Sequence, residues 1–139
     1  MKSICLAFTM GCLLSLAAQT PETYKVRLSP VPVDAQTRAN IEGIGSATAT
    51  LVGARLSITG SFEGLRSPAM DAKIHQGRVT GVRGPAMLDL TVEHADSGKV
   101  TASLDLTPPQ IESLKKGQLY IQIDSEKAPD GNLWGWLLR

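Results

Sequence analysis

From about residue 24 onward, the chain alternates between apolar and polar residues with a period of two. Apolar side chains occupy every second position in segments 24–28, 47–51 and 119–123, and polar side chains fill the positions between them. The same alternation recurs in segments 56–62, 88–92 and 100–104, and Leu133, Gly135 and Leu137 continue its apolar side at the end of the chain. This pattern predicts β-strands with one buried and one solvent-facing side. About seven to nine short strands at this spacing predict an all-β fold, an antiparallel sandwich or barrel.

Glycine and proline residues lie between the predicted strands. Gly53 and Gly98 lie in two tight connections, where the freedom of glycine to adopt a positive φ permits a hairpin. Residues 129–131, Pro-Asp-Gly, are expected to form the turn before the last strand. Residues 76–85 contain three glycines and two arginines, and are expected to form a longer exposed loop.

One short helix is predicted to interrupt the strands, over about residues 108–116. Thr107 is a suitable N-cap, Pro108 suits the first helical position, and Gln110 can close a capping box. Gly117 is expected to end the helix. The helix therefore serves as a connection between two strands.

The N-terminal segment differs in composition from the rest of the chain. Lys2 provides a positive start, residues 4–16 are mostly apolar, and residues 15–17 match the small–x–small pattern that precedes a cleavage site. We therefore predict a signal peptide over residues 1–19 and a single β domain over residues 20–139. The domain is then expected to work outside the cytoplasm, in the periplasm or as a secreted protein, and to have no membrane span after cleavage.

Both cysteines, Cys5 and Cys12, lie within the predicted leader. The mature domain would therefore have no disulfide, thiol nucleophile or thiolate metal site. Cys12 as a lipid acceptor is an alternative that the apolar residues after it disfavour. The formal net charge of the whole chain is +1, and loss of Lys2 with the leader makes the mature domain neutral. A neutral domain has no long-range attraction to nucleic acid or anionic lipid, so neither is expected as a partner.

No known catalytic pattern occurs in the sequence. A phosphate-binding glycine loop, a Gly-x-Ser-x-Gly elbow and a His-Glu-x-x-His helix are all missing, so no enzymatic activity is expected. A Ser–His–Asp site assembled in space is a distant alternative. Of the two histidines, His94 is interpreted as a turn residue. His75 is expected to project together with Lys73 from one side of a strand, since Ala72 and Ile74 have the opposite parity.

Three segments resemble the CHRD domain, the module first described in chordin. Residues 72–77, Ala-Lys-Ile-His-Gln-Gly, with Gly-Pro-Ala at 84–86, resemble its Ala-His-Ile-His … Gly-Pro segment. Residues 119–125, Leu-Tyr-Ile-Gln-Ile-Asp-Ser, resemble its Tyr-Val-Asn-Val-His-Thr strand. Residues 129–137, Pro-Asp-Gly-Asn-Leu-Trp-Gly-Trp-Leu, resemble its Pro-Gly-Gly-Glu-Ile-Arg-Gly-Gln-Leu ending. The resemblance covers about residues 24–138 and implies an immunoglobulin-like fold, an exported location, and binding rather than catalysis. No cofactor is expected.

The chain departs from the family at positions where the family often carries histidine. Of these three positions only His75 is kept, and the others are Lys73 and Asp124. A lysine cation beside the site would repel a metal ion, so no metal site is expected. An ion pair between Lys73 and Asp124, with His75 beside it, is expected instead. The alternative is a site for a metal or a small ligand formed by His75, Asp124 and Tyr120.

The second departure is on the last strand, where Trp134 and Trp136 replace the usual Arg and Gln on the outward side. Clustered aromatic side chains of this kind are typical of a binding surface. The predicted binding face consists of Lys73, His75, Tyr120, Gln122, Asp124, Trp134 and Trp136. We expect an unidentified protein partner there. The alternatives are that loop 76–85 or the N-terminal segment covers the tryptophans as a second small core, or that the terminal strand self-associates at an edge.

Overall fold

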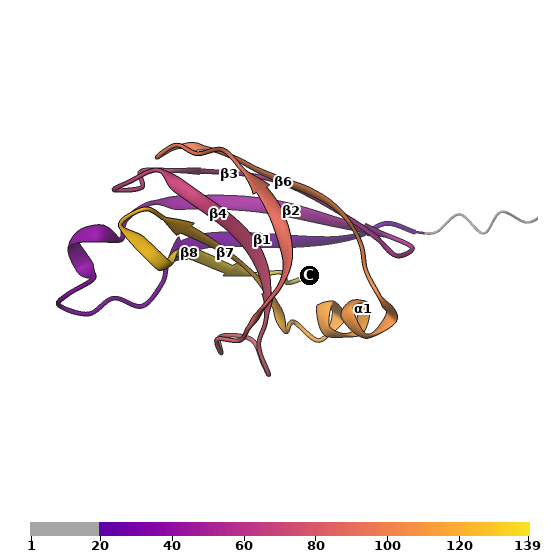
Figure 1. Cartoon of the computed structure of the whole chain (residues 1–139). Coiled ribbons are helices and arrows are strands. Elements are labelled where there is room, and N and C mark those ends of the chain that lie inside the picture. Colours follow the sequence, from indigo (N-terminus) through magenta and orange to yellow (C-terminus); the bar gives the residue numbers. More distant parts are fainter. Residues whose placement is uncertain (1–19) are drawn as a thin grey trace, which may run out of the picture.

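Residues 20–139 are described by the structure, a computed structural model, and the predicted signal peptide with Cys5 and Cys12 lies outside the described residues. Within this range eight strands form a closed barrel in the order β1-β2-β3-β6-β5-β4-β7-β8, with all neighbours antiparallel (Figure 1). The strands are β1 (Glu22–Pro30), β2 (Ile44–Val52), β3 (Arg55–Glu63), β4 (Ala69–Gln76), β5 (Ala86–Val92), β6 (Gly98–Asp105), β7 (Leu119–Ser125) and β8 (Ala128–Trp136). The predicted all-β class and strand number are confirmed.

The predicted helix is confirmed as α1 (Pro108–Lys115), between β6 and β7. The Thr107 side chain accepts a hydrogen bond from the backbone of Gln110, and the Gln110 side chain accepts one from the backbone of Thr107, which completes the capping box. Gly117 follows with a φ of 71°, which satisfies the helix end. The structure adds a single 3-10 turn, η1 (Arg38–Asn40), in the connection between β1 and β2.

The turn before the last strand differs from the prediction. Residues 129–131 belong to β8, and the turn consists of Glu126 and Lys127, with Ser125 paired to Ala128 across the hairpin. Gly131 still has a positive φ of 133°. The Pro-Asp-Gly segment therefore lies within a strand and does not form the turn.

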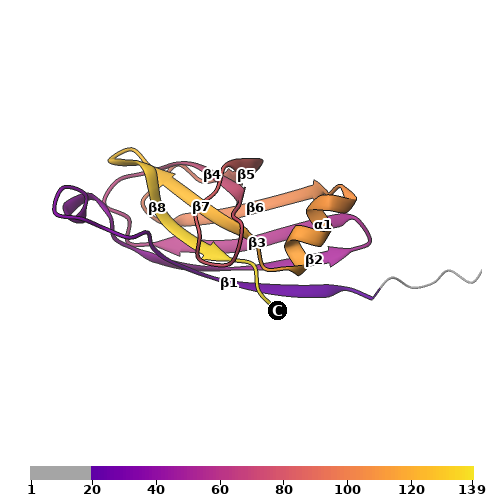
Figure 2. The same ribbon diagram turned by 90° about the horizontal axis from the view of Figure 1, so that it is seen from below.

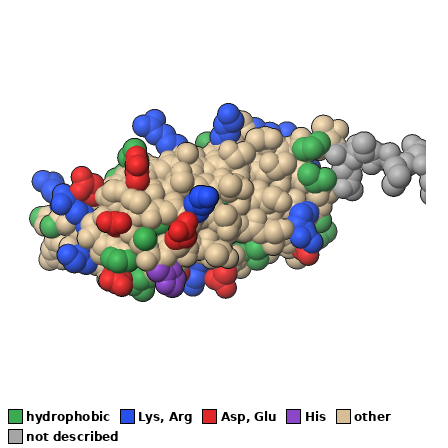
Figure 3. All heavy atoms as spheres, turned by 90° about the horizontal axis from the view of Figure 1, so that it is seen from above, with side chains coloured by type: hydrophobic (Ala, Val, Ile, Leu, Met, Phe, Trp, Pro, Cys, Tyr) green, Lys and Arg blue, Asp and Glu red, His purple; other side chains and the backbone are tan. Residues whose placement is uncertain are grey.

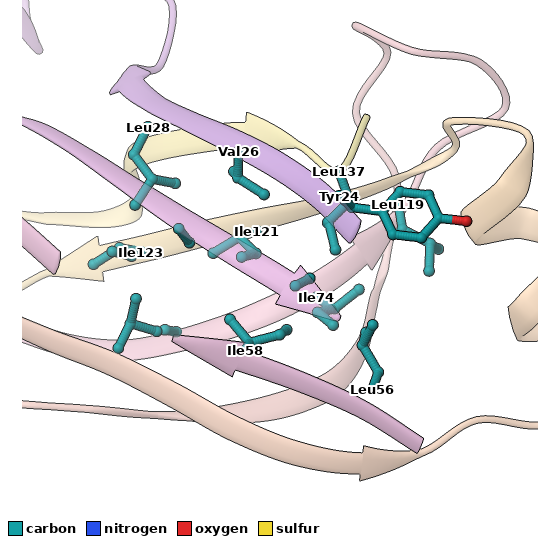
Figure 4. Packing of buried hydrophobic residues seen from close by; sticks show 14 of the residues in the cluster. Tyr24, Val26, Leu28, Leu56, Ile58, Ile74, Leu119, Ile121, Ile123 and Leu137 are labelled. Carbon is teal, nitrogen blue, oxygen red and sulfur yellow. The ribbon is translucent and has the colours of Figure 1, made fainter. Parts of the chain in front are cut away.

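The barrel interior is filled by the apolar residues of the period-two pattern. Side chains from β1, β3, β4 and β7 meet in one cluster (Figure 4). Leu114 of α1 belongs to the same cluster. Fully buried large side chains include Tyr24, Leu28, Leu56, Ile58, Ile74, Leu119, Ile121, Ile123, Leu133 and Leu137. Each such side chain contributes about 1.5–3 kcal/mol relative to an exposed one. This burial replaces the disulfides that the domain lacks.

Barrel closure between β1 and β8 depends on a close approach. The two strands pair only at Ser29–Pro30 of β1, with one further bridge from Lys25 to Leu138 in the described chain. Between these points Gly135 lies against β1, where a Cβ atom would be 2.3 Å from the carbonyl oxygen of Arg27. Any side chain at position 135 would push the strands apart. Glycine between the two tryptophans thus allows β8 to lie on β1.

The barrel has two unlike outer faces. Over β2, β3 and β6 the outward positions in the middle of the strands carry rows of hydroxyl groups, in which Thr48 pairs with Thr59 and Thr59 with Thr101. On β1, Thr23 continues these rows beside Thr50, and the next outward positions are Lys25 and Arg27. We call this surface the hydroxyl face: Thr23, Ser46, Thr48, Thr50, Ser57, Thr59, Ser61, Thr101 and Ser103. A broad area of it carries neither charged nor hydrophobic side chains (Figure 3). The outer side of β4, β7 and β8 carries the residues of the predicted binding face.

Candidate functional site

Four rings from three strands form one contiguous cluster on the outer side of β4, β7 and β8. The register places His75 opposite Tyr120, and Tyr120 opposite Trp136. The His75 and Tyr120 rings are stacked with centroids 5.0 Å apart, and the Tyr120 and Trp136 centroids are 4.6 Å apart. Trp134 meets Trp136 edge to face at 4.7 Å. The alternation of the sequence therefore brings these four side chains together on one surface, the aromatic face.

The loop between β4 and β5 lies across this face (Figure 2). The backbone N–H of Gly84 donates to the Tyr120 hydroxyl at 3.0 Å, and that hydroxyl donates to the Gly84 carbonyl at 3.1 Å. Nδ1 of His75 also lies 2.9 Å from the Gly84 carbonyl oxygen. A Cβ on Gly84 would be 1.7 Å from the carbonyl oxygen of Gln76, so only glycine lets the loop return this close to β4.

The loop changes the exposure that the alternation alone predicts. Tyr120 and Gln122 have outward parity but are only 1% and 5% exposed. The guanidinium of Arg83 lies 5.2 Å from the centroid of the Trp134 ring. Trp134 and Trp136 are half-buried. The outward positions on β7 therefore form a second buried layer, and the two indoles remain partly open at its margin.

A groove of about 460 Å³ runs beside the two indoles, between β1 and β8. Lys25 and Arg27 of β1 and Thr80 of the covering loop contribute to its lining. The indole N–H of Trp136 is buried and has no hydrogen-bond acceptor among residues 20–139. The groove thus combines aromatic ring surface with two cations.

The end of the predicted binding face that contains Asp124, here called the acidic end, is arranged differently from the prediction. Asp124 is directly opposite Asp71, and Lys73 is opposite Gln122. Among the described residues Lys73 and Asp124 form no ion pair, so the expected pair is wrong. The register explains this, because it places a second carboxylate rather than the lysine across from Asp124.

This carboxylate neighbour has an electrostatic consequence. Burial and a hydrogen bond shared with Asp71 raise the pKa of Asp124 to about 7. A hydrogen bond from Gln122 and the charge of Lys73 oppose the increase in this pKa without cancelling it. Asp71 was missed from the sequence, although it has the same parity as Lys73 and His75. The spacing Asp-x-Lys-x-His was the available signal.

The alternative site of His75, Asp124 and Tyr120 is not assembled. Asp124 lies four residues along β7 from Tyr120, which is about 13 Å at the rise of an extended strand. His75 stacks on Tyr120 and is held by Gly84. In the described part of the chain, no three side chains of His, Cys, Asp or Glu gather as metal ligands.

Comparison with known proteins tests the resemblance. No curated protein and no solved structure matches the chain. No helix within residues 20–139 has the length and apolar character needed to cross a bilayer. The family model of the CHRD domain matches residues 24–137, which include all three quoted segments and every strand from β2 to β8. The chain therefore belongs to the CHRD domain family.

Proposed function

We propose that this protein is an exported, non-enzymatic binding module that engages a protein partner through the groove beside Trp134 and Trp136. Membership of the CHRD family supports a binding role in general terms. The leader-like pattern of residues 1–19 supports export. The observation that carries the proposal is the pair of half-buried indoles beside this groove.

The two indoles have the properties of an interface anchor. They meet edge to face at 4.7 Å and rest on Tyr120, so their positions are fixed before a partner arrives. Fixed aromatic side chains lose little conformational entropy on binding and often carry much of the binding energy. The open side of the rings faces the groove, where a partner side chain can insert.

The charges around the groove specify the chemistry of the partner. Lys25, Arg27 and Arg83 surround the indoles, and none of the three forms an ion pair within residues 20–139. Cations free of carboxylate partners at the edge of an apolar anchor favour acidic residues on the opposing surface. The partner is therefore a protein segment that places an apolar or aromatic side chain between acidic ones.

The histidine chemistry supports binding rather than catalysis. His75 is stacked on Tyr120, and its Nδ1 is hydrogen-bonded to the carbonyl of Gly84 rather than to a serine hydroxyl. A general base needs its imidazole within reach of the nucleophile that it activates. His75 therefore serves to hold the covering loop in place.

The test is affinity capture from extracytoplasmic extract with the wild-type domain and two groove variants, Trp134→Ala/Trp136→Ala and Lys25→Glu/Arg27→Glu. We expect both variants to lose the same set of acidic partners, as quantified by mass spectrometry. The matched control is Thr59→Ala/Thr101→Ala on the hydroxyl face, which keeps the partners. Thermal denaturation verifies that each variant is folded. Identical partner lists from the wild type and the folded groove variants would rule out the proposal.

A further inference from the structure

We propose that a second pocket, between the β1–β2 connection and the beginning of β8, binds a short aliphatic monocarboxylate. Its lining combines buried apolar residues with two cations, Arg83 and Lys127. The pocket shares no lining residue with the groove beside Trp134 and Trp136. Binding there therefore does not depend on the proposed partner.

The walls of the pocket are held together by Asn132 of β8, which is fully buried. The backbone N–H of Val31 donates to the carbonyl oxygen of Asn132 at 3.1 Å. The side-chain amide of Asn132 donates to the carbonyl oxygen of Glu42 at 2.9 Å, and its Oδ1 accepts from the Ser125 hydroxyl at 2.8 Å. Both ends of the β1–β2 connection, which carries η1 at one end of the barrel (Figure 1), are thus tied to one residue of β8. The pocket between them is formed before a ligand arrives.

The floor of the pocket is apolar and lies outside the barrel core. Val31, Ile41 and Ala128 form a small buried cluster of their own, with exposed fractions of 3%, 9% and 6%. Pro32 and Pro129 add apolar surface to the lining. The volume is about 280 Å³, just below the range of about 300–1,000 Å³ for drug-sized ligands. An aliphatic body of a few carbon atoms suits this space.

Arg83 provides an oriented cation in the lining. Its guanidinium lies 5.2 Å from the centroid of the Trp134 ring and donates to the carbonyl oxygen of Asp130 at 3.3 Å. Neither contact neutralises its charge, and Arg83 forms no ion pair among residues 20–139. A guanidinium already held in place binds a carboxylate through two parallel hydrogen bonds with little further loss of side-chain entropy.

The charges of the lining select a monoanion. Lys127 supplies the second cation, and its backbone N–H donates to the Ser67 hydroxyl at 2.9 Å, which fixes the turn that carries it. Arg83 and Lys127 against the one carboxylate of the lining, Asp130, leave one net positive charge. A dianion such as phosphate would leave an excess negative charge beside Asp130 and the apolar floor. A carboxylate with an aliphatic body matches both the charge and the floor.

The experiment is an NMR titration of the ¹⁵N-labelled protein with sodium 3-methylbutanoate at neutral pH and constant ionic strength. We expect saturable shifts of the backbone amides of Ile41, Ala128 and Gly131, with a Kd of about 1 mM, within the limits on binding per atom for so small a ligand. Two ligand controls separate the contributions: 3-methylbutanamide keeps the body without the charge, and acetate keeps the charge without the body. Each should bind about tenfold more weakly.

The protein variants test the cations. Arg83→Gln/Lys127→Gln should weaken 3-methylbutanoate binding about tenfold and leave the weak binding of 3-methylbutanamide unchanged. Arg78→Gln removes the same charge from the same loop outside the lining and should keep the affinity. The groove variant Lys25→Glu/Arg27→Glu should keep it too, which separates this site from partner binding. Thermal denaturation verifies that each variant is folded.

The proposal is overturned if the amides of the pocket show no saturable shift below about 20 mM 3-methylbutanoate, roughly twenty times the expected Kd. Equal affinity for the carboxylate and its amide, or an unchanged affinity in the folded Arg83→Gln/Lys127→Gln variant, would also overturn it. Two further titrations test the choice of ligand. Tighter binding of N-acetyl-leucine would assign the pocket to a peptide C-terminus, and tighter binding of inorganic phosphate would assign it to a phosphate group, and either result would overturn the free monocarboxylate.

Discussion

The hydroxyl face and the aromatic face are built by the same alternation on opposite sides of one barrel, yet they differ in almost every physical property. On the hydroxyl face, Thr48, Thr59 and Thr101 are neighbours in a row of short, exposed side chains. On the aromatic face, the outward residue Tyr120 is buried beneath rings and a loop. Outward parity therefore fixes the side of the sheet on which a residue lies, but not its contact with water.

The difference arises from the size of the outward residues. Short hydroxyl side chains satisfy their hydrogen bonds with water and leave no apolar surface to cover. The large rings on β7 and β8 present apolar surface on the outer side of the sheet. The loop 77–85, which includes Arg83, covers part of this surface. A loop is ordered in this way only if the free energy gained by burying apolar area offsets the conformational entropy that the loop loses. The aromatic face thus has a built structure, whereas the hydroxyl face remains a solvated sheet surface.

The largest effect is expected when one outward residue on each face is substituted. Tyr120→Ala should lower the free energy of unfolding by about 3–5 kcal/mol, since it removes a buried ring and leaves a cavity under the loop. Thr59→Ala should change it by no more than about 0.5 kcal/mol. Urea denaturation of both variants measures the two values. Similar small effects at the two positions would show that the loop does not seal Tyr120.

The second test uses the pH dependence of stability. Because the folded-state pKa of Asp124 is raised to about 7, above its unfolded value of about 3.9, the folded state holds a proton that the unfolded chain releases. Stability from this group is present below about pH 4 and is lost as the pH rises through about 7. After allowance for solvent screening of a half-buried carboxyl, we expect a decrease of about 1–2 kcal/mol between pH 5 and pH 8.

Asp71→Asn is the matched variant for the pH test, since it removes the neighbouring carboxylate while burial of Asp124 remains. Its pH dependence should be shallower than that of the wild type, and it should be the more stable protein at pH 8. Both proteins are denatured with urea in identical buffers at pH 5 and pH 8. Parallel curves would mean that the two carboxylates do not interact.

The strands, the helix and the sidedness of the site could be predicted from the sequence, because each depends on local chemistry. Thr107 and Gln110 specify the helix start through their own side chains. The period of two places Tyr120 and Trp136 on the same side of the sheet. The turn at Glu126 and Lys127 was missed, because Pro-Asp-Gly carries a stronger turn signal although it lies within β8.

The cross-strand register could not be predicted, and it determines the chemistry of the acidic end. Alternation is unchanged when one strand slides by two residues against its neighbour. Lys73 and Asp71 are therefore equally good partners for Asp124 in the sequence, and the structure selects Asp71. The burial of Tyr120 by the loop 77–85 also could not be predicted from the sequence. It depends on the path of a glycine-rich loop that has no periodic pattern of its own.

A smaller effect is expected from the hydroxyl that joins the aromatic face to its cover. Tyr120→Phe keeps the ring but removes both hydrogen bonds to Gly84. The free energy of unfolding should therefore decrease by about 1 kcal/mol. The sharper measurement is limited proteolysis, because the loop 77–85 should be cleaved faster. Tyr24→Phe is the control, since its hydroxyl bonds Glu22 and Arg139 at the other side of the barrel. Equal cleavage of both variants would argue that the loop is held by packing alone.

The smallest effect concerns Arg83, the residue by which the loop reaches the indoles. Its guanidinium lies over Trp134 and donates to the carbonyl of Asp130, and an exposed cation–π contact contributes about 0.5–1 kcal/mol. Arg83→Gln should therefore change stability little but expose one face of the indole. Acrylamide quenching in a Trp136→Phe background isolates Trp134, and its quenching constant should rise. Arg78→Gln removes the same charge from the same loop and should leave quenching unchanged. If Arg83→Gln and Arg78→Gln change the quenching constant equally, the positive charge of the loop protects the ring, and the guanidinium over Trp134 does not. Near Trp134 the aromatic face would then lack a specific cover, as the hydroxyl face does.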